Sequence, residues 1–438
     1  MSFVRPARRV LVAAVSFSAL FAVAACGGSG SSNAPAAGGS SAASVDLSKK
    51  GPIEYWQGKD TSGNVKNLVA QFNKDHPNET VTLRELPDNA DQQRQQMIQN
   101  TEIKNPAMAV LNVDVVWTAE FAANGYVVQL PADQFPTSDF LPATVKSATY
   151  FDKLYAYPVS SDGGLLYYRK DLLDKAGISS PPTTWDEMIA DCKKVQANNT
   201  KLECYGGQYD KYEGLTVNFA EAVNSSGGVI VGPDGKPNVS TPEATKGLSF
   251  LVDGFKQGYI PKGAITWKEE QGRQAFQDGS LMFLRNWPYV YSLAEKTDGS
   301  SKVAGKFAVA PLPGLTGPGV SSLGGHNMAI AANATNKGTA AEFIKFMASK
   351  DTQKSNVLAV SAAPTLSGLY TDPEVVKKYP YMPILLKSIQ TAEPRPIAVK
   401  YGDVTLAIQD AAYGALQGQT SSDAALSTLQ TKLSSLIQ

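Results

Sequence analysis

Residues that commonly carry catalysis or bind metals are scarce in this sequence. Its 438 residues include only two histidines, His76 and His326, and three cysteines, too few for a zinc cluster of ordinary spacing. The body of the sequence has no G-x-x-x-x-G-K-[ST] phosphate loop, no G-x-G-x-x-G at a strand–helix junction and no G-x-S-x-G nucleophile motif. We therefore expect no metal, no cofactor and no catalysis. A carboxylate pair of the glycosidase type stays open as an alternative, because 40 acidic residues are available.

Composition and charge exclude further classes of protein. Hydrophobic residues make up 43% of the chain, too many for a disordered protein. The 40 Lys and Arg balance 40 Asp and Glu, whereas a nucleic-acid-binding protein is usually basic. At ~100–200 residues per domain, the length predicts two or three domains, each with its own core.

The N-terminus has the pattern of a secretory signal. Three arginines precede an apolar run at 10–25, which is shorter than the ~20 residues that a membrane-spanning helix needs. The run ends in Val-Ala-Ala-Cys-Gly at 23–27, which resembles a bacterial lipobox. We expect residues 1–25 to be a lipoprotein signal peptide, lipidated Cys26 to anchor the protein to the outer face of the cell membrane, and residues 26–50, rich in Gly, Ser and Ala, to be a flexible tether. A plain signal peptide with a chance cysteine is the alternative.

The other two cysteines are Cys192 and Cys204, with 11 residues between them. Disulfides persist outside the cytoplasm, and a bridge here would contribute ~2–4 kcal/mol to stability. We expect a disulfide, and two buried free thiols are the alternative.

The body alternates between strand and helix patterns. A β-rich run at 53–56 is followed by apolar residues at 65, 68, 69 and 72, the spacing of one helix face. Strands at 81–83 and 113–117 with a helix at 92–101 continue a β-α-β-α-β order, which predicts an α/β layered domain.

The same alternation resumes in the second half of the chain. Thr184 and Glu187 have the spacing of a capping box, which marks the start of a helix. The other predicted elements are a strand at 165–168, a helix at 170–176, strands at 303–311 and 327–331, a helix at 340–347, and helical structure throughout from 403 onward. Two α/β lobes without an internal repeat account for the length.

Six short segments carry a family resemblance when their order and spacing are considered together. They are DVVWTAEF with NGY at 114–126, YAYP at 155–158, LYYRKDL at 166–172, YEGL at 212–215, FLRNWPY at 283–289 and PRP at 394–396. These segments resemble the carbohydrate-binding (maltose/trehalose-type) branch of the solute-binding lipoproteins of ABC importers. The likeness covers the body from about residue 51 to the end.

The resemblance implies an α/β fold of the two-lobed periplasmic-binding-protein type, with a hinge and a ligand cleft between the lobes. Lobe 1 would comprise residues 51–158 and 313–350, and lobe 2 residues 159–312 and 351–438. Ligand binding would close the hinge. The implied partners are an oligosaccharide in the cleft and the membrane-spanning permease subunits, which would dock on the outer faces of a monomer.

A sugar site needs hydrogen-bonding groups for the hydroxyls and aromatic faces for the C–H surfaces. At positions implied by the resemblance, Trp287 would stack on the sugar beside Tyr289. Asp162 stands before a Gly-Gly pair, and Arg395 is held between two prolines, where it suits a bidentate contact with vicinal hydroxyls. The alternatives are core packing for Trp287, a turn cap for Asp162 and a surface ion pair for Arg395.

Further candidates come from loops and strand ends. Gly325 and His326 enter a strand from a Gly-rich loop, and relatives often carry an aromatic residue where His326 stands, so this departure leaves the exact ligand open. The remaining candidates are Glu120 at a strand end, Glu269 and Glu270, one of which would face the cleft, and the loop residues Gln57, Asn89 and Asp91.

These features predict an extracytoplasmic receptor that delivers an oligosaccharide, foremost a glucose disaccharide such as trehalose or maltose, to a permease. The alternatives are a receptor for a monosaccharide, a polyol or a glycerol phosphodiester, and a secreted glycosidase. A phosphate ligand would need more cations than Arg395, Lys59 and Arg285 provide.

Overall fold

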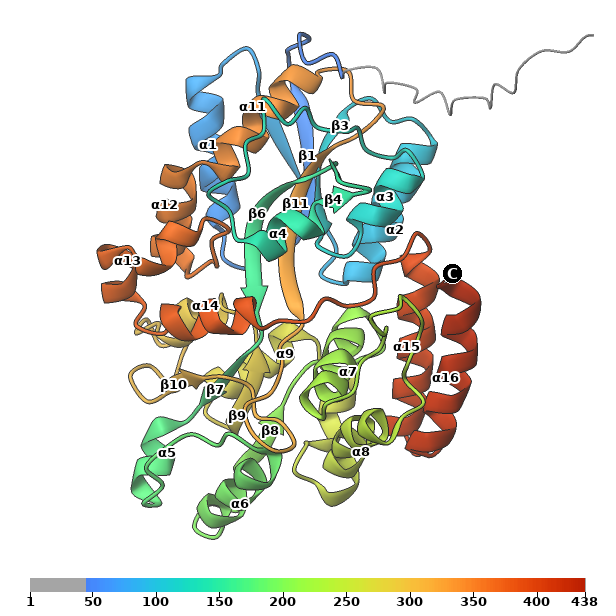
Figure 1. Cartoon of the computed structure of the whole chain (residues 1–438). Helices are drawn as coiled ribbons and strands as arrows, with labels where there is room; N and C mark the ends of the chain where they lie inside the picture. The colour runs from blue at the N-terminus through green and yellow to red at the C-terminus, as the bar shows by residue number, and fades with distance from the viewer. Residues whose placement is uncertain (1–44, 438) are drawn as a thin grey trace, which may run out of the picture. The chain divides into compact units, whose positions relative to one another are not determined.

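The computed structural model describes residues 45–437 and contains two main β-sheets (Figure 1). The first sheet consists of β1 (Ile53–Gly58), β2 (Val81–Leu86), β3 (Met108–Asp114), β6 (Tyr157–Gly163) and β11 (Leu323–Ile330). Its strand order is β2-β1-β3-β11-β6. β1 pairs in parallel with β2 and β3, and β11 runs antiparallel to both β3 and β6.

Helices pack around this sheet and form with it what we call the first lobe. They are α1 (Asn64–Asp75), α2 (Ala90–Glu102), α3 (Thr118–Ala123), α4 (Pro142–Ser147), α11 (Lys337–Ala348) and α12 (Lys350–Val360). A hairpin of β4 (Thr149–Tyr150) and β5 (Lys153–Leu154) lies beside α3. The apolar face predicted for α1 is confirmed, because Leu68, Val69 and Phe72 are buried in the core of this lobe.

The second lobe is built on the second sheet. Its strands are β7 (Leu165–Tyr168), β8 (Glu203–Gly206), β9 (Leu281–Asn286) and β10 (Ala308–Ala310), in the order β10-β7-β9-β8. The surrounding elements are α5 (Lys170–Lys175), α6 (Trp185–Gln196), α7 (Glu213–Ser225), α8 (Pro242–Gln257), η1 (Lys262–Thr266), α9 (Glu269–Gln277), α10 (Val290–Ala294), η2 (Ser367–Thr371), α13 (Pro373–Lys378), α14 (Met382–Gln390), α15 (Tyr401–Leu416) and α16 (Ser422–Leu436).

The two lobes are joined by strands that run from one sheet to the other. Only Gly164 separates the end of β6 from the start of β7. A Cβ atom at Gly164 would lie 2.6 Å from Glu221 Oε1 and 3.0 Å from Arg285 Nη2, so a larger residue at this crossing would displace the Glu221–Arg285 pair. Figure 1 shows β6 and β11 passing together between the two groups of helices. This is the two-lobed fold that the sequence predicted, whereas the exact lobe boundaries stay a prediction.

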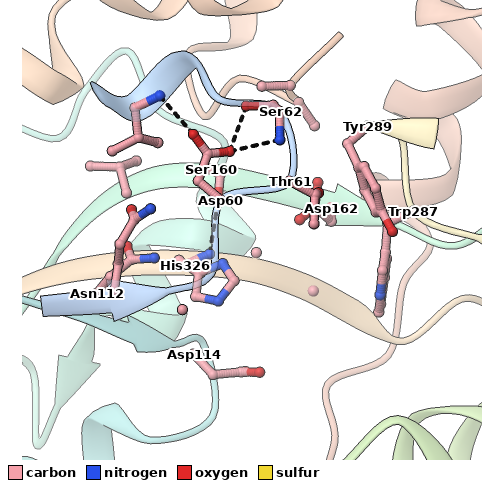
Figure 2. A pocket seen from close by; sticks show the side chains of 18 of the residues that line it. Asp60, Thr61, Ser62, Asn112, Asp114, Ser160, Asp162, Trp287, Tyr289 and His326 are labelled. Carbon is pink, nitrogen blue, oxygen red and sulfur yellow. Dashed lines mark hydrogen bonds between the residues drawn. The ribbon is translucent and has the colours of Figure 1, made fainter. Parts of the chain in front are cut away.

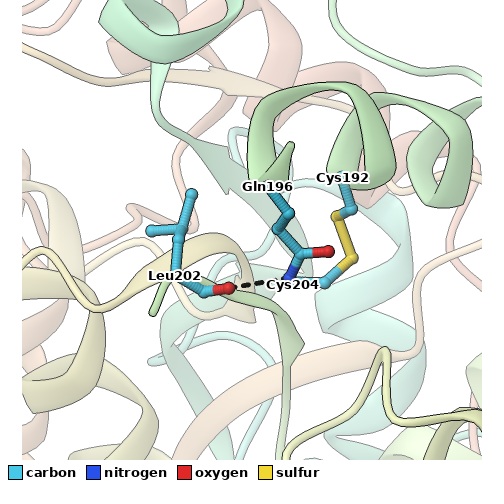
Figure 3. Close-up of a disulfide and its surroundings, with 4 residues drawn as sticks. All are labelled: Cys192, Gln196, Leu202 and Cys204. Atoms are coloured by element: carbon cyan, nitrogen blue, oxygen red, sulfur yellow. Dashed lines mark hydrogen bonds between the residues drawn. A yellow bond between two sulfur atoms is a disulfide. The ribbon is translucent and has the colours of Figure 1, made fainter. Parts of the chain in front are cut away.

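Two local features of the second lobe confirm predictions. Thr184 Oγ1 accepts from the Glu187 amide, and Glu187 in turn accepts from the Thr184 amide, completing the capping box at the start of α6. Cys192 on α6 and Cys204 on β8 form a disulfide (Figure 3). The bridge ties the C-terminal half of α6 to the edge of the second sheet.

Three predicted elements differ from the observed ones. The strand expected at 113–117 lies instead at Met108–Asp114, because the Asp114 side chain and carbonyl accept from the amides of Val116 and Trp117 and turn the chain. The strand expected at 303–311 is reduced to β10 by a turn at 303–306. The C-terminal helical region is divided between α15 and α16, where Gly418 adopts a left-handed φ of 72°.

The predicted signal peptide, lipidated Cys26 and most of the tether lie outside the described residues. Within 45–437, no helix is both long and apolar enough to cross a bilayer.

Candidate ligand-binding site

A cavity of about 380 Å³ lies where elements of both lobes meet. The first lobe contributes the loop between β1 and α1, the ends of β3, β6 and β11, and the chain around the end of α12. The second lobe contributes the starts of α7 and α9 and the loop after β9. In Figure 2, Trp287, Tyr289 and Asp162 lie toward one side of this cavity, and His326 and Asn112 toward the other.

The Trp287 ring is supported from behind by a buried ion pair. The Arg285 guanidinium lies 3.9 Å from the centroid of the Trp287 ring. Arg285 donates to both carboxylate oxygens of Glu221, at 2.6 Å from Nε and 2.5 Å from Nη2. The hydroxyl of Tyr167 donates to the Trp287 carbonyl at 2.8 Å. One face of the indole is thus occupied by the guanidinium, and the ring is fixed as a flat wall of the cavity.

Two tyrosine–glutamate pairs stand beside this aromatic wall. The Tyr289 hydroxyl donates to Glu270 Oε1 at 2.6 Å, and Glu270 Oε2 also accepts from Arg273. The Tyr212 hydroxyl donates to Glu269 Oε2 at 2.7 Å, and burial raises the pKa of Glu269. Both glutamates line the cavity, but only Glu270 is neutralised by an arginine among the described residues, which leaves Glu269 free to accept from a ligand.

Asp162 lines the cavity without a partner of its own. In the part of the chain that the structure describes, its carboxyl group makes neither a hydrogen bond nor an ion pair. Burial, followed by the nearby Asp114 carboxylate, raises the pKa of Asp162 to about 7. Asp162 is half-buried, and an acceptor that is partly shielded from water and left unpaired is costly, so hydroxyl groups of a bound ligand would relieve this cost.

Arg395 lies at the centre of a buried charge network. It donates to Asp114 Oδ1 at 2.7 Å from Nη2 and to Glu213 Oε1 from Nη1. Glu213 also accepts from Tyr401 at 2.5 Å and from Thr405 at 2.7 Å. Burial raises the pKa of Glu213 to about 7, although the Arg395 charge opposes this. The Arg395 side chain is 2% exposed, and its Nε atom has no partner among the described residues.

Gly325 and His326 lie on β11, next to β6. Gly325 has a φ of 105°, and a Cβ atom there would lie 2.3 Å from the Ser160 carbonyl oxygen. The His326 amide donates to Ser160 Oγ at 3.0 Å. Burial lowers the pKa of His326, so its ring is neutral at pH 7 and can donate from one nitrogen and accept at the other.

The loop after β1 forms another part of the cavity wall. Gln57 accepts from the Tyr55 hydroxyl at 2.6 Å. Asp60 accepts from the Val65 amide at 2.8 Å and from Ser62, so it caps the start of α1 rather than pairing with a cation. Lys59 lies at the exposed rim of the cavity.

Nine of the predicted site residues are brought together in this cavity, and three are not. The nine are Gln57, Asp162, Glu269, Glu270, Trp287, Tyr289, Gly325, His326 and Arg395. Outside the lining, Glu120 accepts from Arg94 at 2.6 Å, and Asn89 caps α2 by accepting from the Gln92 amide at 3.1 Å. Asp91 instead accepts from the Glu213 amide of the second lobe.

The cavity also contains polar residues that the sequence did not single out. They include Asn112, Asp114, Ser160, Tyr212 and Glu213. Asp114 follows the pattern of side chains at the carboxyl end of a strand, and Glu213 belongs to the YEGL segment at 212–215. The sequence therefore contained a signal for each residue. It did not distinguish them from polar residues outside the site, because it does not reveal that Arg395 binds both.

A family model described as bacterial extracellular solute-binding protein matches residues 57–354. The chain belongs to this family. A probable ABC transporter-binding protein of Deinococcus radiodurans is 34% identical over 81% of this chain and 86% of its own length. This solute-binding protein is also 26% identical to the galactooligosaccharide-binding protein of Bacillus subtilis, over 88% of this chain and 86% of that protein.

Solved structures agree with this assignment. The maltose-bound T. maritima MalE3 has 34% sequence identity and a TM-score of 0.83, covering 87% of this chain and 98% of that one. A solute-binding protein from Thermotoga lettingae bound with α-D-tagatose shares the fold at 21% identity and a TM-score of 0.81, covering 89% of this chain and 100% of that one. The predicted resemblance to carbohydrate-binding ABC receptors is confirmed.

Proposed function

We propose that this solute-binding protein is the extracytoplasmic receptor of an ABC sugar importer, and that it captures a glucose disaccharide such as maltose or trehalose between its lobes. The observation that carries the proposal is the combination, in one cavity, of the Trp287 ring with the carboxyl groups of Asp162 and Glu269, which form no ion pair among the described residues. A sugar presents C–H faces to an aromatic ring and hydroxyl donors to carboxylates.

The charges of the cavity support a neutral ligand over an anionic one. Arg395 is already held by Asp114 and Glu213, and Lys59 is exposed at the rim. Asp162 and Glu269 form no ion pair within residues 45–437, although the Arg285 charge lies near both. A sugar phosphate or glycerol phosphodiester would be repelled by these carboxylates, whereas hydroxyl groups would donate to them.

The relatives support a sugar of more than one ring. The T. maritima protein was solved with maltose bound, and the B. subtilis protein is a galactooligosaccharide-binding protein. The cavity volume of about 380 Å³ lies at the lower end of the ~300–1,000 Å³ typical of small-molecule sites. This size favours a mono- or disaccharide over a long oligosaccharide.

The proposal includes the partners that a receptor of this kind requires. The permease would dock on the outer faces of the two lobes, and lipidated Cys26 with its tether would keep the protein at the membrane. The receptor itself would carry out no chemistry, and transport energy would come from a separate ATPase.

Calorimetric titration of the protein with maltose, trehalose, glucose, mannitol and glycerophosphodiesters tests the proposal. We expect binding of at least one disaccharide with a Kd at least tenfold below that of glucose. Binding of only a monosaccharide, a polyol or a phosphodiester would keep the receptor class and refute the disaccharide. Release of glucose from maltose or trehalose during the titration would instead identify a glycosidase.

A further inference from the structure

Helix α7 begins at the cavity without a cap from its own chain segment. Its N-cap residue, Tyr212, makes no side-chain capping hydrogen bond, and its hydroxyl donates to Glu269. The first amide groups of a helix have no partner within the helix, and they carry partial positive charge. Tyr212, Glu213 and Gly214 line the cavity. The Tyr212 amide donates to the Asp210 carbonyl and the Leu215 amide to the Tyr212 carbonyl, so it is the Glu213 amide whose partner has to come from across the cleft or from solvent.

Asp91 of the first lobe is that partner. The Glu213 amide donates to Asp91 Oδ2 at 3.1 Å, and Gln409 Nε2 of α15 donates to the same oxygen at 3.2 Å. Asp91 lies in the first turn of α2, whose Met97 is buried in the core of the first lobe. α7 and most of α15 share the core of the second lobe, although Tyr401 at the start of α15 packs in the core of the first. One carboxylate therefore holds two elements of the opposite lobe.

Within its own lobe, Asp91 is the acidic residue in the first turn of α2, where its charge stabilises the start of that helix. It does not line the cavity, and it forms no ion pair within the described residues. A carboxylate removed from water is stabilised only if it is hydrogen-bonded, and both donors belong to the second lobe. When the lobes separate, Asp91 and the α7 amides return to water, so the bond exists only while the lobes are together. The nearby Lys268–Asp88 pair, at 3.4 Å, is more exposed and contributes little.

We propose that Asp91 is a positioning residue that holds the lobes closed over the ligand by capping α7 from the opposite lobe. The inference rests on the proposed function only in taking a sugar as the ligand. Because Asp91 does not touch the cavity, it acts by raising the fraction of protein in the closed, binding-competent state. The apparent Kd equals the intrinsic Kd divided by that fraction, so every ligand of the cavity loses the same factor when Asp91 is removed.

Asp91→Ala, Asp91→Asn and the control Asp133→Ala, at an exposed aspartate of the first lobe, test the proposal by titration and stopped-flow measurements with maltose and trehalose. Loss of a helix cap predicts an affinity about 3- to 30-fold lower for Asp91→Ala, with faster dissociation and the same factor for both sugars. Asp91→Asn should lie between wild type and Asp91→Ala, because an amide oxygen still accepts. Asp133→Ala should match wild type.

A second readout does not depend on the identity of the ligand. In the ligand-free protein, hydrogen exchange of the peptide at 212–216 should be several-fold faster in Asp91→Ala than in Asp133→Ala, since the Glu213 amide loses its acceptor. Unchanged exchange, or an affinity loss that differs more than about threefold between the sugars, would overturn the proposal. Failure of wild type to bind either sugar would refute the disaccharide, while the exchange comparison still decides the role of Asp91. If Asp91→Ala does not fold, Asp91→Asn is compared with Asp133→Ala in the same two measurements.

Discussion

Replacing Asp162 with asparagine should stabilise the protein while weakening its binding of sugar. The carboxyl group has a pKa of 3.8 in an unfolded chain and of about 7 in the cavity wall. Because folding raises this pKa, the ionised carboxylate lowers the free energy of unfolding. The loss is complete above pH 7 and becomes smaller as the pH falls toward 3.8. The difference between the two pKa values corresponds to a loss in the free energy of unfolding of about 4 kcal/mol at pH 8 and about 2 kcal/mol at pH 5. The neutral amide of the variant would carry no such cost at either pH.

Chemical denaturation of the ligand-free protein at pH 8 and pH 5 measures this difference. We expect Asp162→Asn to exceed wild type in its free energy of unfolding by up to about 4 kcal/mol at pH 8, and by about half as much at pH 5. The control Asp133→Asn, at an exposed position, should show no pH-dependent difference. A variant less stable than wild type at pH 8, or equally stabilised at both pH values, would refute the reasoning.

The same variant tests the site, because it replaces a charged acceptor with a neutral one. Hydrogen bonds to charged groups contribute about 1.5–3 kcal/mol, so the affinity for the bound sugar should fall at least about tenfold. A variant that is more stable than wild type but binds the sugar more weakly would show that Asp162 contributes to binding while it destabilises the fold. An unchanged affinity would remove Asp162 from the site.

Three further substitutions test other parts of the molecule. Trp287→Ala should lower sugar affinity at least tenfold while the circular dichroism spectrum stays that of wild type, and unchanged affinity would exclude stacking on this ring. Glu221→Gln should lower the free energy of unfolding by about 3–5 kcal/mol in urea, because it leaves the Arg285 charge buried without its counterion. Gly325→Ala should lower the melting temperature, since its Cβ atom would collide with the Ser160 carbonyl; a melting temperature equal to that of wild type would contradict the backbone geometry described at β11.

Local signals in the sequence were sufficient for many elements of the fold. The apolar spacing of α1 and the capping box of α6 specify their helices through neighbours within four residues. The strand predicted at 113–117 was wrong in its position, because the apolar residues at 115–117 are buried in a turn and not in a strand. Periodicity reports burial, whereas the Asp114 side chain that ends β3 acts through a hydrogen bond which periodicity does not reveal.

The site was less accessible from sequence, because charge pairing across the fold decides which polar residues remain free. Glu120 is occupied by Arg94, 26 positions away, although it resembles a ligand-binding carboxylate at a strand end. Glu213 was not singled out because its partner Arg395 is 182 positions distant. Trp287 and Asp162 were found through the family resemblance, which already contains the information on long-range contacts that a single sequence lacks.

The disulfide between α6 and β8 also determines what a cut in the backbone would do. Residues 197–201, which lie between the two cysteines, are exposed, and exposed loops are preferred sites of proteolysis. Trypsin cleavage after Lys201 would leave both parts of the chain covalently joined through Cys192 and Cys204. A nicked molecule would therefore migrate as one band without reductant and as two bands with it, and a reducing gel alone would make a receptor that is still assembled look degraded.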